Sequence, residues 1–202
     1  MQAVMKVLLV SEGHHEMGKD QETGALEFFV RGIYEGSLQC DLAKVSRKDI
    51  HAHHGKGRGY FKRAIRWMLE AKKNGYDALI LVIDQDNQPD RIKQFTEAQK
   101  TDNILFRRAL GVAIRTFDAW ILADERALSQ ILNDTISAQS RPEEVRDAKE
   151  RCAELLTNSM AQNEFYAAVA AKARIDTLEK QCPKGFAPFA ERVRLLQVDS
   201  DG

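Results

Sequence analysis

The stretch Ala78-Leu-Ile-Leu-Val-Ile-Asp84-Gln-Asp86 decides the fold of this 202-residue chain. Its first six residues are all apolar, and the apolar run stops abruptly at Asp84. A short run that is apolar on both faces is typical of a strand in a parallel sheet, because helices cover both faces of such sheets. We therefore predict a central buried strand over residues 78–83, with Asp84 and Asp86 at its carboxyl end.

Three further segments are predicted as strands, and helical periodicity fills the spaces between them. The strands are expected at residues 4–10, 38–45 and, with the weakest pattern, 111–116. Apolar residues recur at the 3.6-residue helical spacing in four segments, which are 26–33, 61–68, 89–108 and 117–132. This alternation predicts an α/β protein with a doubly wound, mainly parallel sheet flanked by helices.

The pattern becomes purely helical after about residue 137. Helices are predicted over residues 143–156, 162–180 and 186–196. Some 65 residues of this kind make a small core by themselves. We therefore predict an α/β core over residues 1–136 and a C-terminal helical extension over 137–202, packed on that core as one domain.

Composition and charge exclude several classes of protein. Hydrophobic residues make up 44% and charged residues 30%, which is ordinary for a globular protein, and 30 basic residues balance 30 acidic ones. A nucleic-acid surface must then be a local patch, because no global positive field exists. The three widely spaced cysteines indicate a reduced compartment. No apolar run is long enough for a membrane span and no signal peptide is visible, so we expect a cytoplasmic protein without a membrane partner.

Acidic residues follow the predicted strands. Ligands of an open parallel sheet bind outside the carboxyl ends of its strands, where Glu12, Asp84, Asp86 and Asp118 are expected. In extended backbone Asp84 and Asp86 project the same way, and such carboxylates repel one another unless a cation intervenes. Mg²⁺ (or Mn²⁺) is the expected cation, since it favours hard oxygen ligands. The alternative is that these residues are turn formers or helix caps.

Four short motifs, in this order, resemble those of a known family. They are Val7-Leu-Leu-Val-Ser-Glu12-Gly-His-His-Glu16, Leu79-Ile-Leu-Val-Ile-Asp84-Gln-Asp86, Phe117-Asp118-Ala-Trp-Ile-Leu-Ala-Asp124 and Cys182-Pro-Lys-Gly-Phe186-Ala-Pro-Phe189. The first two resemble the Glu-Gly and Asp-x-Asp motifs of the Toprim domain, with the second glutamate typical of OLD-type nucleases. The other two resemble a subgroup of uncharacterised bacterial Toprim-like proteins.

This resemblance implies a Toprim fold that performs metal-dependent phosphodiester chemistry. It implies that Glu12, Asp84 and Asp86 are catalytic, with Glu12 a metal ligand and the candidate general base. Glu16 would complete one or two Mg²⁺ sites with these acids, and Asp118 would support the second ion. Two ions about 4 Å apart stabilise the attacking and leaving oxygens together. Members of the OLD-like group are associated with separate ATPase subunits and with defence against phage.

A histidine- and glycine-rich loop at residues 51–59 follows the second predicted strand. Its Lys56 and Arg58 could contact a phosphate backbone and supply the local basic patch. Capture of a transition metal by His51, His53 and His54, or a simple solvated loop, are the alternatives. His14 and His15 beside Glu12 could contact nucleic acid or transfer a proton, or could simply be exposed.

The sequence favours a Mg²⁺-dependent nuclease, or a related phosphoryl-transfer protein, that acts on DNA or RNA. The main alternative is a noncatalytic Toprim-like subunit that binds an ATPase or nucleic acid. A third interpretation takes Asp84-Gln-Asp86 as the metal–nucleotide motif of a glycosyltransferase, which the short chain disfavours. No P-loop motif is present, so an ATPase would be a separate protein. The oligomeric state, including a homo-oligomer, stays open.

Overall fold

Four parallel strands form one sheet in the computed structural model, which describes residues 4–13, 15–18, 22–34, 40–44, 59–156 and 160–196. The strand order is β2-β1-β3-β4, and the bounds are Met5–Ser11 for β1, Cys40–Lys44 for β2, Ala78–Asp84 for β3 and Arg107–Ala113 for β4. The predicted α/β class with a parallel sheet flanked by helices is confirmed, and the arrangement is consistent with a Toprim-like doubly wound fold.

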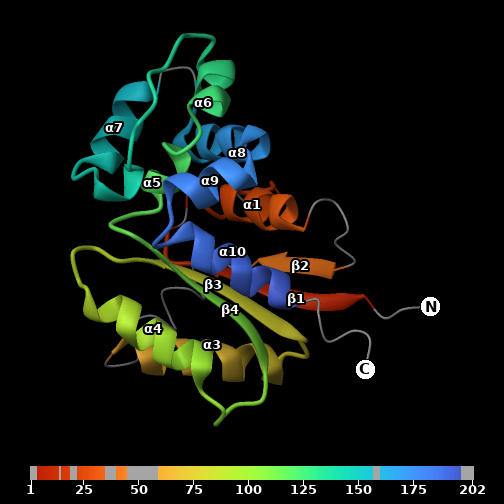
Figure 1. The fold of residues 1–202 in the computed structure, drawn as a ribbon. Helices are drawn as coiled ribbons and strands as arrows, with labels where there is room; N and C mark the ends of the chain where they lie inside the picture. Colours follow the sequence, from red (N-terminus) through yellow and green to blue (C-terminus); the bar gives the residue numbers. More distant parts are fainter. Residues whose placement is uncertain are drawn as a thin grey trace.

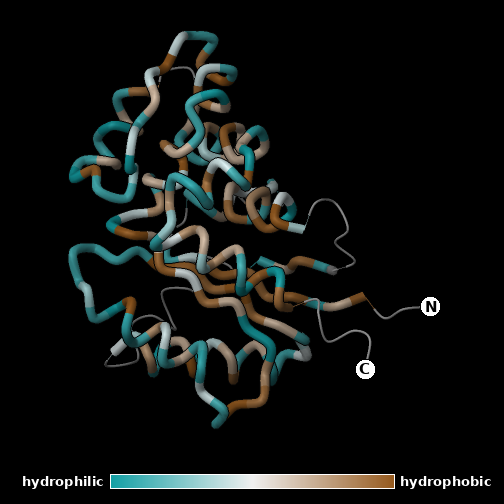
Figure 2. Tube along the Cα trace, viewed as in Figure 1, coloured by the Kyte–Doolittle hydropathy of each residue, from teal (hydrophilic) through white to brown (hydrophobic). Residues whose placement is uncertain are grey.

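Alternate side chains of each strand enter two separate hydrophobic cores, because successive residues of a strand point to opposite faces. One face packs against α3 (Tyr60–Lys73) and α4 (Asp90–Lys100). The other packs against α1 (Ala25–Ile33) and α10 (Phe186–Leu195). Figure 1 shows these helices as layers on either side of the sheet, and Figure 2 shows the hydrophobic residues gathered in the strands between them.

The helices after β4 build onto the α1 side of the sheet. They are α5 (Asp118–Ile121), α6 (Glu125–Leu132), the short 3₁₀ helix η1 (Pro142–Glu144), α7 (Ala148–Leu155), α8 (Gln162–Lys172) and α9 (Ile175–Gln181). Helix α8 packs on α1, and α10 packs on β4 beside the sheet. The boundary between core and extension near residue 136 stays a prediction. Within the described residues, no helix combines the length and apolar character that a bilayer crossing needs.

The structure corrects several predicted boundaries. Strand β4 begins at Arg107 rather than at residue 111, and α4 ends at Lys100 rather than continuing to residue 108. Arg108 can lie in the strand because its guanidinium donates to the carbonyls of Gln99 (3.0 Å), Ile104 (2.9 Å) and Phe106 (3.1 Å). These hydrogen bonds satisfy a partly buried charge without a ligand.

The helices predicted over residues 117–132 and 162–180 are each broken in two, and one buried carboxylate explains both breaks. Asp124 caps α6 by accepting from the backbone amides of Arg126 (3.1 Å) and Ala127 (3.3 Å). Its other oxygen accepts from the backbone amide of Arg174 (2.9 Å), directly before α9. A capping carboxylate sets where a helix begins. The predicted helix over 143–156 is likewise replaced by η1 and α7.

Trp120 stands at the centre of the larger core, fully buried. Its ring stacks on Phe189 at 5.4 Å and meets Phe186 edge-on at 5.1 Å, with Phe117 also 5.1 Å away. The motif around Trp120 and the motif near the C-terminal end therefore pack against each other. Such aromatic contacts stabilise beyond simple area burial, and they fix the loop that carries Asp118.

Candidate functional site

The sheet topology brings the predicted acidic residues to one edge. Strands β1 and β3 are neighbours, but the helices that follow them pack on opposite faces of the sheet, and ligands of such sheets bind at this kind of strand end. Glu12 follows β1, with its amide bonded to the Val82 carbonyl at 3.1 Å, and Asp84 ends β3. Asp118 begins α5, shortly after β4. Residues about a hundred positions apart thus share one site.

Three carboxylates, which we call the inner group, lie deep at this edge: Glu16, Asp84 and Asp118. Each accepts a hydrogen bond from a group without charge. The hydroxyl of Ser11 donates to Glu16, and the backbone amide of Phe117 donates to Asp84 at 2.7 Å. The hydroxyl of Tyr166, on α8, donates to Asp118.

The inner group holds more negative charge than its surroundings stabilise. Burial raises the pKa of Asp84 to about 7, although the hydrogen bond from the Phe117 amide lowers it. The negative charges of Asp86, Asp118 and Glu12 raise this pKa further. Burial also raises the pKa of Glu16 well above its ordinary value, with the charges of Asp84, Asp118 and Glu12 contributing. Carboxylates that perturb one another in this way are a mark of functional sites.

Two carboxylates, the outer group, lie nearer to solvent: Glu12 and Asp86. The guanidinium of Arg91, on α4, donates to Glu12 at 3.3 Å, to Asp86 at 2.9 Å and to the backbone carbonyl of Asp84. Arg91 is only 5% exposed and lies over the ring of Tyr60, 4.2 Å from its centroid. Burial still raises the pKa of Glu12 although the charge of Arg91 opposes it. One arginine therefore does not neutralise the edge.

The predicted geometry of Asp84 and Asp86 is wrong. Strand β3 ends at Asp84, and Asp86 adopts a positive φ of 48° within a turn, so the two residues are not in continuous extended backbone. The amides of Gln85 and Asp86 bond to the carbonyls of Ala113 and Arg115, each at 2.9 Å. This turn, rather than strand alternation, brings Asp86 to Arg91.

Gly13 is needed for the close approach of Glu16. A Cβ at this position would lie 2.2 Å from the Glu16 carboxylate. The side chain of Glu16 therefore folds back over the glycine to reach Ser11. The Glu-Gly pair of the first motif has a physical role here: the glycine admits the second glutamate to the edge.

Of the remaining predicted site residues, the structure describes only His15. His14, Lys56 and Arg58 lie outside the described residues, as do His51, His53 and His54. His15 is described and partly exposed, in the loop between Glu12 and Glu16.

Sequence reasoning missed three residues that hold the acids in place: Ser11, Arg91 and Tyr166. Arg91 belongs to the segment 89–108 that is predicted as a helix, and only its position five residues after Asp86 hints at pairing. Tyr166 lies 48 positions from Asp118, and no local pattern marks it.

The chemistry of these donors fits a hard divalent cation, because all are carboxylate oxygens. Burial, with a smaller contribution from neighbouring carboxylates, raises the pKa values of Glu12, Glu16 and Asp84. Within the described residues, no three His, Cys, Asp or Glu side chains already converge closely enough to hold a metal ion. The guanidinium of Arg91 bridges two of these carboxylates, those of Glu12 and Asp86. Thr116, one residue before Phe117, also has a buried hydroxyl without a hydrogen-bond partner.

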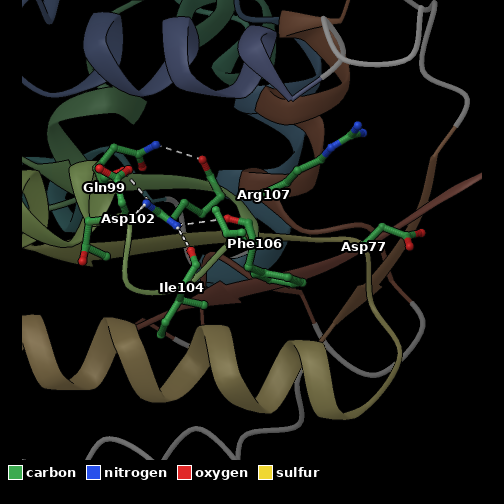
Figure 3. A pocket seen from close by; sticks show the side chains of 9 residues that line it. Asp77, Gln99, Asp102, Ile104, Phe106 and Arg107 are labelled. Atoms are coloured by element: carbon green, nitrogen blue, oxygen red, sulfur yellow. Dashed lines mark hydrogen bonds between the residues drawn. The ribbon is translucent and has the colours of Figure 1, made fainter. Parts of the chain in front are cut away.

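The structure has hollows at both ends of the sheet. One, of about 440 Å³, adjoins Arg91 and is lined by Tyr60, Asn87, Gln88 and Gln94 among others. The other, of about 460 Å³, lies at the opposite end of the sheet near Asp77 and Arg108. Figure 3 shows that Gln99 and the 101–107 loop surround it, with Arg107 pointing away. There Arg108 is bound by its own loop, so only the first hollow adjoins the acidic edge.

Comparison of the chain with protein-family models, with curated proteins and with solved structures found no match. The case for a function therefore depends on the geometry of the acidic edge.

Proposed function

We propose that this protein is a Mg²⁺- or Mn²⁺-dependent nuclease, or a related phosphoryl-transfer enzyme, that acts on DNA or RNA. The observation that carries the proposal is the excess of carboxylate at the ends of β1 and β3. Five carboxylates lie at this edge of the sheet. Among the described residues, Arg91 is the one cationic side chain that donates to them. The raised pKa values of Asp84, Glu16 and Glu12 indicate that the edge has capacity for a further cation.

A divalent ion held there would polarise phosphoryl oxygens and lower the pKa of an attacking water. Glu12 and Asp84 would supply ligand oxygens from two strands, and Asp86 would supply a third from the turn. Glu12, the more accessible glutamate, is also the candidate general base. Glu16 and Asp118 would hold or orient a second ion from the buried side, with Tyr166 fixing the Asp118 carboxylate.

The proposal extends to partners and place. Nucleic acid is the proposed substrate, a separate ATPase subunit is the proposed partner, and defence against phage in the cytoplasm is the proposed setting. A homo-oligomer is compatible with this reading. These points depend on the resemblance to OLD-like Toprim proteins rather than on a measured contact.

Cleavage assays on plasmid, linear duplex, single-stranded DNA and RNA test the enzyme, with Mg²⁺, with Mn²⁺ and with chelator. We expect metal-dependent cleavage that Asp84→Asn lowers by at least about a hundredfold, as loss of a metal ligand or of charge at a reacting centre does. Asp77→Asn is the matched control, because Asp77 lies at the amino end of the same strand and bonds only to the backbone of Lys6. Equal cleavage by Asp84→Asn and wild type would contradict the proposal.

A noncatalytic subunit is the second candidate, and the pairing of Arg91 with Glu12 and Asp86 favours it, because an ion pair can stabilise carboxylates without a metal. Metal binding without cleavage of any substrate, together with stable binding of nucleic acid, would favour this candidate over the enzyme.

A further inference from the structure

The guanidinium of Arg91 lies where a cation between the outer carboxylates would lie. One nitrogen of Arg91 is within 3.3 Å of Glu12 Oε2 and within 2.9 Å of Asp86 Oδ2, and it also donates to the carbonyl of Asp84. These are three of the oxygens that an ion bound by the ends of β1 and β3 would meet. A divalent ion bound to these same oxygen atoms would lie close to the guanidinium, and the two positive charges would repel each other.

Arg91 is held in this position from its other side. Its guanidinium carbon lies 4.2 Å from the centroid of the Tyr60 ring, and the side chain is 6% exposed. Cation–π contact and burial both favour this arrangement. Its Nε, however, is buried without a hydrogen-bond partner, so the pairing satisfies the guanidinium incompletely. The adjoining hollow of about 440 Å³ offers room for another position of the side chain.

We propose that Arg91 is a resident counter-ion which competes with the divalent metal for Glu12 and Asp86, so that metal binding requires the guanidinium to leave them. The inference rests on the proposed function, because it concerns the same metal site. It adds a regulating residue to that site. Arg91 is a positioning residue here: it sets the affinity for the ion and occupies one oxygen of each outer carboxylate until the ion arrives.

Titration calorimetry of Mg²⁺ and Mn²⁺ into wild type, Arg91→Gln and Arg63→Gln tests the competition. We expect Arg91→Gln to bind metal at least about tenfold more tightly, the equivalent of one charge-assisted hydrogen bond. Arg63 is the matched control, because its guanidinium also lies over Tyr60, at 4.6 Å, and its charge also acts on Glu12, but it donates to no carboxylate among the described residues. Arg63→Gln should change the affinity by less than about threefold.

Equal or weaker metal binding by Arg91→Gln would overturn the inference and leave the proposed function standing. Binding by Arg91→Gln alone, with none by wild type, would support it most directly. Absence of binding from both proteins, with nucleic acid added, would overturn the metal site and the inference together.

A second measurement covers the case in which Arg91→Gln does not fold. Spectra of wild type labelled with ¹⁵N-arginine report each guanidinium, and Arg91→Lys identifies the Arg91 signal by its loss. Saturating Mg²⁺, which is diamagnetic, should shift that signal more than the signal of Arg63. An unmoved Arg91 signal at saturation would show that the ion binds without displacing it.

Discussion

The inner and outer carboxylates lie at the same edge of one sheet but are stabilised in different ways. Glu16, Asp84 and Asp118 accept from a serine hydroxyl, a backbone amide and a tyrosine hydroxyl. Glu12 and Asp86 share a guanidinium. Burial raises the pKa values of Glu16 and Asp84, to which no described cationic side chain donates, whereas Arg91 donates to both outer carboxylates. The difference teaches that a metal ion would replace protons on the inner side and an arginine on the outer side.

The largest expected effect is a pH dependence that arises from the inner group. The pKa of Asp84 is about 7 in the folded chain, against an ordinary value of 3.8, so the folded state holds this proton when the unfolded state has lost it. Its contribution to stability is present below pH 4 and is lost as the pH rises to about 7. A shift of this size corresponds to about 4 kcal/mol over the whole range, of which about 2–3 kcal/mol falls above pH 5.

Thermal unfolding of wild type and Asp84→Asn in chelator measures this effect. Between pH 5 and pH 8, the Tm of wild type should fall by roughly 6–10 °C more than the Tm of Asp84→Asn. Titrating groups that do not interact with Asp84 cancel in that difference, so it reports the titration of the inner group. A constant difference in Tm across the range would mean that Asp84 titrates normally and that the inner group is not strained.

Removal of one charge from each group should change stability in opposite directions. Glu16→Gln keeps an oxygen for Ser11 and removes a buried charge, so we expect the metal-free protein to gain about 1–2 kcal/mol at pH 8, or roughly 4 °C. Asp86→Asn loses an ion pair of a side chain that is 49% exposed, so a loss below about 1 kcal/mol is expected.

Asparagine suits the positive φ at position 86, so the backbone is not the cause of that loss. Denaturant unfolding of the two variants in chelator gives both values. A gain in stability from both substitutions would remove the distinction between the groups, since Arg91 would then not support charge on Asp86.

The smallest expected effect concerns the link between the helical extension and the inner group. Tyr166→Phe removes the donor to Asp118, and we expect about threefold weaker metal binding with a stability loss near 1 kcal/mol. Tyr34→Phe is the matched control, because its buried hydroxyl donates to the Val193 carbonyl at 2.9 Å, on helix α10. It should cost similar stability without changing metal affinity.

Calorimetry and thermal unfolding of both tyrosine variants separate a positioning role from a packing role. Equal metal affinity of Tyr166→Phe and Tyr34→Phe would show that the hydrogen bond from Tyr166 to Asp118 does not contribute to metal binding.

Several features followed from local sequence. The mainly apolar segment at residues 4–10, interrupted by Lys6, and the continuous apolar run at 78–83 predicted the two central strands, because strands that are covered on both faces are apolar at successive positions. The rule that ligand sites lie at the carboxyl ends of parallel strands then brought Glu12 and Asp84 to one edge. The boundaries of the elements were predicted less well. Strand β4 was predicted too late in the chain, since it begins with two arginines. Asp124 ends or begins helices where the apolar periodicity is continuous.

The sequence by itself determined the fold class, the central strands and which acids follow them, because these depend on periods of a few residues. Only the tertiary structure decided how those acids are held. Arg91 meets Glu12 across 79 positions and Tyr166 meets Asp118 across 48, through helices that pack on opposite faces of the sheet. Burial and hydrogen bonding set the charge of each carboxylate, and both arise only when distant segments pack together.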